Sequence, residues 1–468
     1  MAVGVVAALV LGAAGTAAAE PAKEADFNGD GHPDLAVGGP YATVSKQADA
    51  GAVGLVWGSA KGLNAKKVGT IKQSQAAIPG EPGEYEMFGW ALRSGDFDGD
   101  GYADLAVSTP QEDRGDEVPP GALFLVFGSP TGLTSAIRLD PPPDDDYLGW
   151  FAGTLTVGDY DKDGFDDLVV GMLNDIDNPA YLIKGKADLR KPGAATFVPV
   201  VTPNPPWSIG DPAAGDINGD SYDDLVVPRR YGQRTEALVY FGGASGLGKT
   251  PQRQPGSGYY TATGDLDNDG YDDIAFGDPS ARIVSDSNGL VRVWYGSKNG
   301  LDTKRGVLKL TQLTPRIPDD PEEPDGFGAA VAIGDVNGNG RADLAIGTEN
   351  ESIGKILQAG KVFLIYGDAK GIVPATARID TFTQDSPGVQ DSVEDHDTFG
   401  TGLAFRDFNG DGLAELQVSA PGENGFEGSV TILKGAKSGL TGIGSQTYTP
   451  ANTGIGKTEA GFGIGLDK

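Results

Sequence analysis

The 468-residue sequence contains no cysteine and only two histidines, His32 and His396. The absence of cysteine excludes disulfide bonds, thiolate metal ligands, a cysteine nucleophile and a lipid-modified cysteine. The two histidines form no zinc-type motif, and no nucleophile-elbow serine is present. Basic side chains are also scarce, because 36 Lys and Arg oppose 66 Asp and Glu and give a formal net charge of −30. This charge excludes an electrostatic grip on a nucleic-acid backbone and favours bound cations.

Long apolar runs are confined to the N-terminal end. Residues 1–19, MAVGVVAALVLGAAGTAAA, predict a signal peptide with an A-x-A-type cleavage site before Glu20, followed by a short linker at 20–25. No Lys or Arg precedes the apolar core, so either the α-amino group is its only positive charge or the true start lies upstream. An uncleaved anchor is the alternative. No second run is long enough to span a membrane. We therefore expect a secreted, extracellular monomer without a membrane span after cleavage.

What the sequence has in abundance is a repeat, together with 73 glycines and 31 prolines. A phrase that begins DFNGDGHPDLAVG at Asp26 recurs six times. The later copies begin at Asp96, Asp159, Asp216, Asp265, Asp335 and Asp407. A second phrase, such as GALFLVFGSPTGL at 121–133, follows each copy and is eroded only in the third unit, at 180–189. Internal repeats of this kind indicate one supersecondary unit per copy.

Each unit contains apolar runs of four to six residues bounded by Gly, Asp or Pro, which predict short strands joined by tight turns. We count four strands per unit: the Phe-Gly stretch, the DLAVG-type run, the LVWG-type run and a weaker run such as VGTIK at 68–72. The predicted fold is all-β, a seven-bladed β-propeller of four-stranded antiparallel blades over residues 26–468. Tandem β-sandwich domains are the alternative, which the short connections disfavour.

The C-terminal segment GFGIGLDK, residues 461–468, carries a Phe-Gly pair with no acidic loop after it. The first repeat, in contrast, begins at Asp26 without a Phe-Gly strand of its own. We therefore predict that the C-terminal strand joins the N-terminal blade, closes the ring and covers an otherwise free sheet edge.

The repeated loops place side-chain oxygens at positions 1, 3, 5 and 9, usually with Gly at position 6. Ca²⁺ prefers six to eight oxygen ligands, and alternate residues of a tight loop can converge on one ion. Position 7 is expected to offer its backbone carbonyl, so its side chain is free to vary. The predicted ligands, grouped by loop, are Asp26, Asn28, Asp30, His32 and Asp34; Asp96, Asp98, Asp100, Tyr102 and Asp104; Asp159, Asp161, Asp163, Phe165 and Asp167; Asp216, Asn218, Asp220, Tyr222 and Asp224; Asp265, Asp267, Asp269, Tyr271 and Asp273; Asp335, Asn337, Asn339, Arg341 and Asp343; and Asp407, Asn409, Asp411, Leu413 and Glu415.

Asp-Gly and Asn-Gly pairs also form ordinary hairpin turns. Turns alone do not explain oxygens at the same four positions in all seven copies, so we expect up to seven Ca²⁺ ions. The sixth loop has the fewest carboxylates and is predicted to bind most weakly, and Ser221 in place of glycine is expected to strain the fourth loop. Calcium would replace the missing disulfides as a source of stability, and chelation should destabilise the fold.

The Phe-Gly strand, the D-x-[DN]-x-[DN]-G-x-x-[DE] loop and the following VGGP, VSTP or VSAP (37–40, 107–110, 418–421) resemble FG-GAP repeats. Such repeats form the seven-bladed propeller of integrin α subunits and occur in many secreted bacterial proteins. The resemblance implies that the loops bind Ca²⁺ and brace the blades. It departs in the third unit, which has Phe151-Ala152, and in the fourth and fifth units, which lack the Phe-Gly pair. The leg domains of integrins and the separate catalytic domain of glycosylphosphatidylinositol-specific phospholipase D have no counterpart here.

Recognition is expected on the face opposite the acidic loops, which carries the longer insertions at 76–87, 140–150, 314–326 and 384–397. We predict a non-catalytic binding or adhesion module for an extracellular glycan, matrix component or protein. A polysaccharide-degrading lyase or glycoside hydrolase on the same scaffold is the alternative, because acidic loops offer many carboxylate pairs. His396 is expected to be a solvated loop residue, and Trp207 is a candidate for stacking on a sugar.

Overall fold

The computed structural model describes residues 24–113, 119–142, 150–173, 179–191, 193–201, 207–232, 234–284, 287–322, 324–456 and 459–468. The predicted signal peptide and residues 20–23 of the linker lie outside these ranges. The described chain is built of β-strands, with one four-residue helical turn, α1 (Glu423–Phe426). In this part of the chain, no helix has the length and apolar character needed to cross a membrane.

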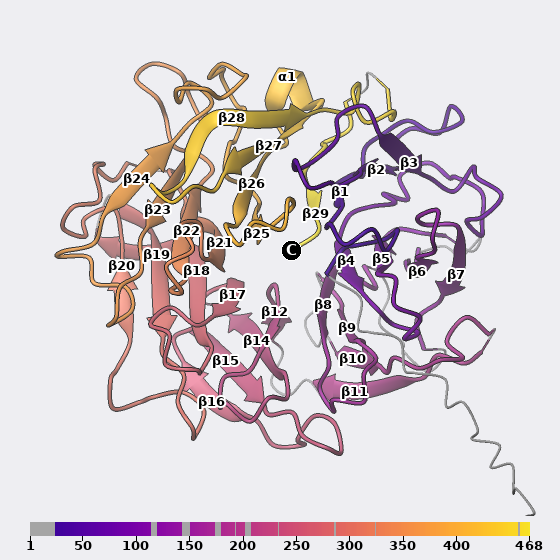
Figure 1. Ribbon diagram of the computed structural model, residues 1–468, viewed down its shortest axis with the longest axis horizontal. Coiled ribbons are helices and arrows are strands. Elements are labelled where there is room, and N and C mark those ends of the chain that lie inside the picture. The colour runs from indigo at the N-terminus through magenta and orange to yellow at the C-terminus, as the bar shows by residue number, and fades with distance from the viewer. Residues whose placement is uncertain are drawn as a thin grey trace, which may run out of the picture.

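The strands form antiparallel sheets arranged around a common axis, as blades of a β-propeller (Figure 1). Four sheets have four strands each. In spatial order they are β29 (Gly465–Leu466), β1 (Leu35–Gly39), β2 (Ala52–Val56) and β3 (Val68–Ile71); β4 (Leu92–Gly95), β5 (Asp104–Thr109), β6 (Ala122–Phe127) and β7 (Ser135–Leu139); β8 (Thr154–Gly158), β9 (Asp167–Gly171), β10 (Ala180–Ile183) and β11 (Phe197–Val201); and β25 (Leu403–Arg406), β26 (Glu415–Ala420), β27 (Ser429–Lys434) and β28 (Thr441–Tyr448). The prediction of four-stranded antiparallel blades is confirmed.

Two sheets depart from four strands. One contains β12 (Ser208–Ile209), β13 (Ala213–Gly215), β14 (Asp224–Tyr231), β15 (Arg234–Tyr240) and β16 (Gln252–Pro255). Both β12 and β13 pair with β14, so together they take the place of the first strand of this sheet. The interruption between them contains Pro212, which cannot donate a ladder hydrogen bond.

The other contains β17 (Tyr260–Gly264), β18 (Asp273–Val284), β19 (Ser287–Trp294), β20 (Leu308–Leu310), β21 (Phe327–Gly334), β22 (Asp343–Thr348), β23 (Lys361–Ile365) and β24 (Ile379–Phe382). Its two halves, β17–β20 and β21–β24, are joined only through the pairing of Gly289 with Phe327.

Burial follows the position of a strand within its sheet. The two middle strands, such as β5 and β6, are buried at every residue because neighbouring sheets cover both of their faces. The outermost strands, such as β3 and β16, are largely exposed or half-buried. The apolar core consists of clusters between adjacent sheets, one of which includes Phe88 and Leu105 of one sheet and Val53 of its neighbour. The repeat therefore provides both the sheets and the surfaces that join them.

The Phe-Gly pairs mark the entry into each blade. Phe88, Phe327 and Phe399 are completely buried, and the glycines that follow have φ between 90° and 99°. After this left-handed conformation β4 begins at Leu92 and β25 at Leu403, and not at Phe88 and Phe399 as predicted. In the sixth unit the prediction is confirmed, because β21 begins at Phe327. Near the C-terminal end, Phe462 is buried in the same way, and β29 pairs with β1. In Figure 1 the C-terminal end lies near the centre of the propeller.

Candidate metal centre

The seven acidic loops occupy equivalent places, each leading into the strand that lies second from the centre of its sheet. We call these loops the hairpins and number them along the chain. Because strands alternate in direction, the hairpins share one end of the blades. The opposite end, the loop face, holds the connections that follow the second and the fourth strand of each unit. Among the predicted ligands, the structure brings three carboxylates together in each of the second, third and fifth hairpins.

Positions 4 and 6 of every hairpin have positive φ, which folds the loop back on itself. Gly99 and Gly101 of the second hairpin have φ of 69° and 87°. In the fourth hairpin Ser221 adopts φ of 70° at position 6, a conformation that costs an L-residue energy and confirms the expected strain.

The carboxylate at position 1 organises the loop backbone in all seven copies. In the second hairpin, Oδ1 of Asp96 accepts the N–H of Asp100 at 3.1 Å, and Oδ2 accepts the N–H of Gly101 at 3.0 Å. The side chain at position 5 accepts the N–H of position 7, as Asp100 does from Tyr102 at 3.1 Å. The same bonds recur in the other six hairpins. The loop is therefore held in shape by its own acidic side chains.

Position 9 is buried in every copy and ties the hairpin to the next strand. Oδ2 of Asp104 accepts the N–H of Phe97 at 3.1 Å, and Oδ1 accepts the N–H of Gly128 at 2.8 Å. Burial raises the pKa of these carboxyls to about 7 for Asp34, Asp167, Asp224, Asp343 and Glu415, to about 8 for Asp273 and to about 9 for Asp104. A nearby cation would offset this cost of burying the charged form.

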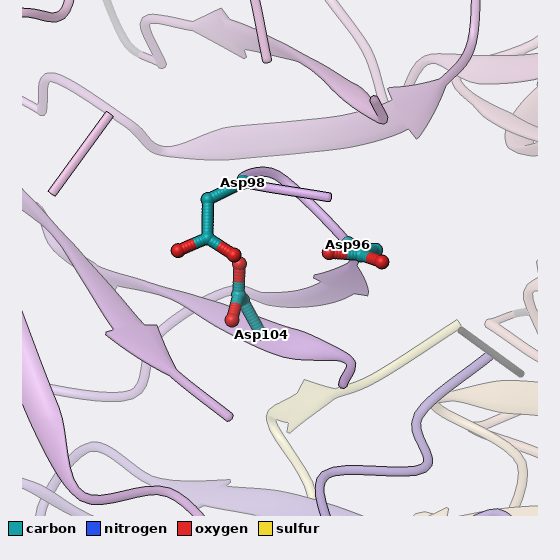
Figure 2. Close-up of side chains that lie close together, drawn as sticks. All are labelled: Asp96, Asp98 and Asp104. Carbon is teal, nitrogen blue, oxygen red and sulfur yellow. The ribbon is translucent and has the colours of Figure 1, made fainter. Parts of the chain in front are cut away.

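The carboxylate at position 3 completes the candidate site. Asp96, Asp98 and Asp104 each have an oxygen within 4.8 Å of the others, and so do positions 1, 3 and 5 of the third and fifth hairpins. Figure 2 shows the carboxylates of Asp98 and Asp104 turned toward each other. Oδ1 of Asp98 is buried without a hydrogen-bond partner, as are Oδ1 of Asp161 and Oδ1 of Asp267. Since buried polar atoms normally have partners, these oxygens fit a hard cation.

Basic side chains flank the same three hairpins, a feature that the sequence analysis missed. Oδ2 of Asp98 pairs with Arg190, Oδ2 of Asp161 with Lys184, and Oδ2 of Asp267 with Arg305 at 2.5 Å. These are the hairpins with carboxylates at all four positions. In the other four hairpins, which have fewer carboxylates, no ion pair joins a basic residue of the described ranges to a predicted ligand.

Contacts between successive hairpins were also missed. Oδ2 of Asp166, at position 8 of the third hairpin, accepts the N–H of Asp96 in the second at 2.7 Å. Asp223 and Asp272 make the equivalent bond to the preceding hairpin, at 2.9 Å in both cases. The signal was the Asp-Asp pair that only the third, fourth and fifth repeats contain. These hydrogen bonds directly connect neighbouring hairpins, each of which is a candidate metal site.

The side chain at position 7, which was predicted only to be free to vary, makes contacts with the preceding hairpin. A Cβ added to Gly29 would lie 2.6 Å from Cε1 of Tyr102, and one added to Gly99 would lie 2.5 Å from Cε1 of Phe165. In these two cases the position-7 side chain packs against the glycine at position 4 of the preceding hairpin. The backbone N–H at position 7 donates to the side chain at position 5, as described above. Coordination of a cation by the position-7 carbonyl stays a prediction.

The axis of the propeller contains a cavity of about 560 Å³ lined by the innermost strands. Two cations that line it are paired with Asp211, Lys468 at 2.6 Å and Arg93 at 3.2 Å. The lining also contains the acidic residues Glu24, Asp96, Asp166 and Asp223. Burial raises the pKa of Asp211, but these two cations outweigh it and lower the pKa overall.

The remaining predicted positions lie on the loop face. His396 is exposed, with Nδ1 2.6 Å from Oε1 of Gln358. Trp207 is half-buried, and Arg229 covers one face of its ring at 4.7 Å. This contact leaves Trp207 less open to a sugar than expected. The insertion at 140–150 lies mostly outside the described residues.

The chain is thus a β-propeller protein with acidic hairpins suited to hard cations. Family models agree: the FG-GAP repeat matches residues 25–56, 88–126, 327–365 and 399–433, and the FG-GAP-like repeat matches residues 159–227. The chain carries FG-GAP repeats.

Curated relatives have the same kind of sequence over part of their length. Integrin alpha pat-2 of Caenorhabditis briggsae is 29% identical over 295 residues, which cover 61% of this chain and 20% of that protein. Phosphatidylinositol-glycan-specific phospholipase D of Homo sapiens is 35% identical over 166 residues, covering 31% of this chain and 18% of that protein. The chain spans about a fifth of the length of these relatives. A crystal structure of BBS1N in complex with ARL6DN, soaked with lead, aligns over 86% of this chain and 89% of that one with a TM-score of 0.44 and 12% identity, too distant to bear on function.

Proposed function

We propose that the chain is a secreted, calcium-bound, closed ring of seven blades whose loop face binds an extracellular glycan, matrix component or protein without catalysis. The blade count follows if the eight-stranded sheet represents two blades joined by one backbone pairing. Seven apolar clusters support it, because each cluster joins two units that are adjacent in this order. One of them unites Val430 and Tyr448 of the last sheet with Val37 and Leu466 of the first.

The segment around Phe462 supports closure. Phe462 pairs with Gly428 of the last unit, and Gly463 donates its N–H to the carbonyl of Gly38 in the first unit at 3.0 Å. Phe399, at the start of the seventh unit, pairs in the same way with Gly360 of the sixth unit. On the hairpin side, a Cβ added to Gly410 would lie 3.8 Å from the imidazole of His32.

Calcium is the cation that the hairpins fit best. Their donors are all oxygens, seven copies share one geometry, and the position-9 carboxylates are buried. Ca²⁺ accepts such irregular oxygen cages, whereas Mg²⁺ retains water and demands an octahedron. The sixth hairpin, with carboxylates only at positions 1 and 9, binds most weakly.

The placement of exposed apolar side chains carries the assignment of a binding function. Among the described residues, four of the eight exposed large hydrophobics lie on connections of the loop face, Tyr85, Leu313, Leu357 and Phe426, and a fifth, Tyr231, ends β14 at the same face. The remaining three, Val68, Val198 and Ile443, belong to the outermost strands. Exposed apolar groups displayed on a rigid scaffold are typical of recognition surfaces.

The test incubates the calcium-bound protein with a panel of extracellular polysaccharides and matrix proteins. Retained protein and newly released sugar ends are measured in parallel. Leu357→Asp and Phe426→Asp should reduce retention, whereas Val198→Asp on an outermost strand should not. Release of sugar ends that requires loop-face carboxylates would make the protein an enzyme and refute the proposal. Equal retention of all three variants would place the binding surface elsewhere.

A further inference from the structure

Three units contain a second, buried arrangement at the loop face, unrelated to the hairpins. It combines a glutamine two residues beyond the fourth strand, an acid two residues before the next Phe-Gly phenylalanine, and a glutamate three residues beyond the following unit's second strand. The copies are Gln73, Glu86 and Glu112; Gln312, Asp325 and Glu351; and Gln384, Asp397 and Glu423. All nine side chains are buried. We call each copy a Gln–acid–acid cluster.

The contacts within the clusters repeat as closely as their positions. Nε2 of Gln73 donates to Oε2 of Glu112 at 2.8 Å, and Nε2 of Gln312 donates to Oε2 of Glu351 at 3.0 Å. Gln384 donates to Glu423 in the same way. The three clusters are therefore built on one plan and can be compared directly.

In the first two clusters a basic side chain compensates the buried acids. Nη1 of Arg138 pairs with Oε1 of Glu112. Nζ of Lys361 lies 3.0 Å from Oε1 of Glu351 and 2.5 Å from Oδ2 of Asp319. Buried carboxylates are costly without such a partner.

The third cluster has more negative charge and no described basic partner. Glu394 joins Asp397 and Glu423, with one oxygen of each within 4.8 Å of the others. Among the described residues, no ion pair links these three acids to a lysine or arginine. Ser429 replaces Lys361: Ser429 pairs with Ala420 of β26 as Lys361 pairs with Thr348 of β22.

Two buried oxygens at this place also have no partner. The side chain of Gln384 is 1% exposed, and its carboxamide lies against Glu423 while Oε1 accepts no hydrogen bond, as is also true of Gln73 and Gln312 in the other two clusters. Oγ of Ser429 is likewise buried and unpartnered. An unpartnered amide oxygen beside three carboxylates is the donor set expected around a hard cation.

We propose that Gln384, Glu394, Asp397 and Glu423 bind one divalent cation, Ca²⁺, in the position where the other clusters hold a lysine or arginine. The ion would join the segment before β25 to the turn that contains α1. It would thereby fix exposed Phe426 on the loop face. This site lies at the other end of β26 from the seventh hairpin and needs no hairpin ion.

The experiment counts Ca²⁺ bound per chain by equilibrium dialysis and elemental analysis. Glu423→Gln should bind one ion fewer than the parent protein, while Glu351→Gln, the matched change in the lysine-containing cluster, should bind the same number. Glu394→Gln removes an exposed ligand with little risk to folding and should weaken one site about tenfold or more. An unchanged count and affinity in Glu394→Gln and Glu423→Gln would overturn the proposal.

A proton could neutralise Glu423 instead, because burial, followed by the charges of Asp391 and Asp397, raises its pKa to about 8. Ser429→Lys separates the two cases by supplying the missing ammonium group. If the site holds calcium, this variant should lose one ion and become more resistant to thermal unfolding in chelator. If the parent binds no ion there, the count stays the same in every variant. The hairpin sites are tested separately, because only variants of hairpin residues should lose hairpin ions.

Discussion

The backbone N–H of Gly463 donates to the carbonyl oxygen of Gly38 at 3.0 Å, although the two glycines lie at opposite ends of the chain. Gly400 donates to Ser419 at 2.8 Å and Gly89 to Ser108 at 2.9 Å, in each case at the start of a blade. The C-terminal segment therefore makes the contact that Gly89 and Gly400 make with residues of their own units, 19 residues further along the chain. Contacts between distant segments of this kind also make folding depend on both ends of the chain.

Phe462→Ala should lower the free energy of unfolding by about 3–5 kcal/mol, because it removes a fully buried aromatic ring from the cluster between the first and last sheets. Phe426→Ala is the matched control, since that ring is 60% exposed and should change stability by less than about 0.5 kcal/mol. Chemical denaturation in saturating calcium measures both. Equal effects of the two changes would show that the C-terminal segment does not stabilise the ring.

Removal of calcium should destabilise the fold, because the hairpins would retain clusters of buried carboxylates without a counter-ion. Each site should contribute about 2.7 kcal/mol when free calcium is a hundred times its dissociation constant. Thermal unfolding across a calcium titration should show a midpoint that rises steadily with ion concentration. Magnesium at the same ionic strength controls for screening and should be less effective. A midpoint that ignores both calcium and chelator would contradict this account.

The metal-free protein should become less stable as the pH rises from about 4 toward 9. The position-9 carboxyls have unfolded pKa values of about 4, and burial raises their folded values to about 7–9. The folded state therefore binds more protons than the unfolded state across this window, so stability falls with increasing pH. Unfolding in excess chelator at pH 5 and pH 8 measures the effect. Saturating calcium should reduce the difference, because the ion takes the place of the protons; greater metal-free stability at pH 8 would be the opposite result.

Ser221→Gly should stabilise the fourth hairpin by up to about 1 kcal/mol, because glycine adopts positive φ without the steric cost that serine bears. The reciprocal change, Gly101→Ser at φ of 87°, should destabilise the second hairpin by a similar or larger amount. Both are measured by thermal unfolding in calcium. If Ser221→Gly lowers the midpoint, the serine hydroxyl contributes something that the backbone argument omits.

The sequence allowed prediction of the parts of the structure that repeat with local spacing. The hairpin positions and their glycines follow from patterns within a few residues. The fourth strand of the first unit, predicted at 68–72, was found at Val68–Ile71. The Phe-Gly strand of the second unit was placed too early because the turn at Gly89 depends on packing against the preceding unit, whereas in the sixth unit β21 begins at Phe327 as predicted. The contacts of Arg190 and Asp166 were missed because they cross between blades, where sequence separation carries no information about distance.

The Gln–acid–acid clusters illustrate the same limit. Gln384 and Glu423 are separated by 39 residues, as are Gln73 and Glu112, and only the folded sheets bring them together. The shared spacing is present in the sequence, but only the structure shows that the glutamine and the glutamate form a buried hydrogen bond. The strand registers were needed to show that Lys361 and Ser429 occupy equivalent positions in their units.

The most direct test of the account is the number of calcium ions bound by the chain, measured by equilibrium dialysis as free calcium is raised to millimolar concentration. The account predicts one ion for each of the seven hairpins, with the sixth filling last, and a loss of one when Asp104 is changed to Asn. The ion proposed at Glu423 is counted separately through its own variant. Binding of no ions, together with unfolding that is insensitive to chelator, would contradict the account.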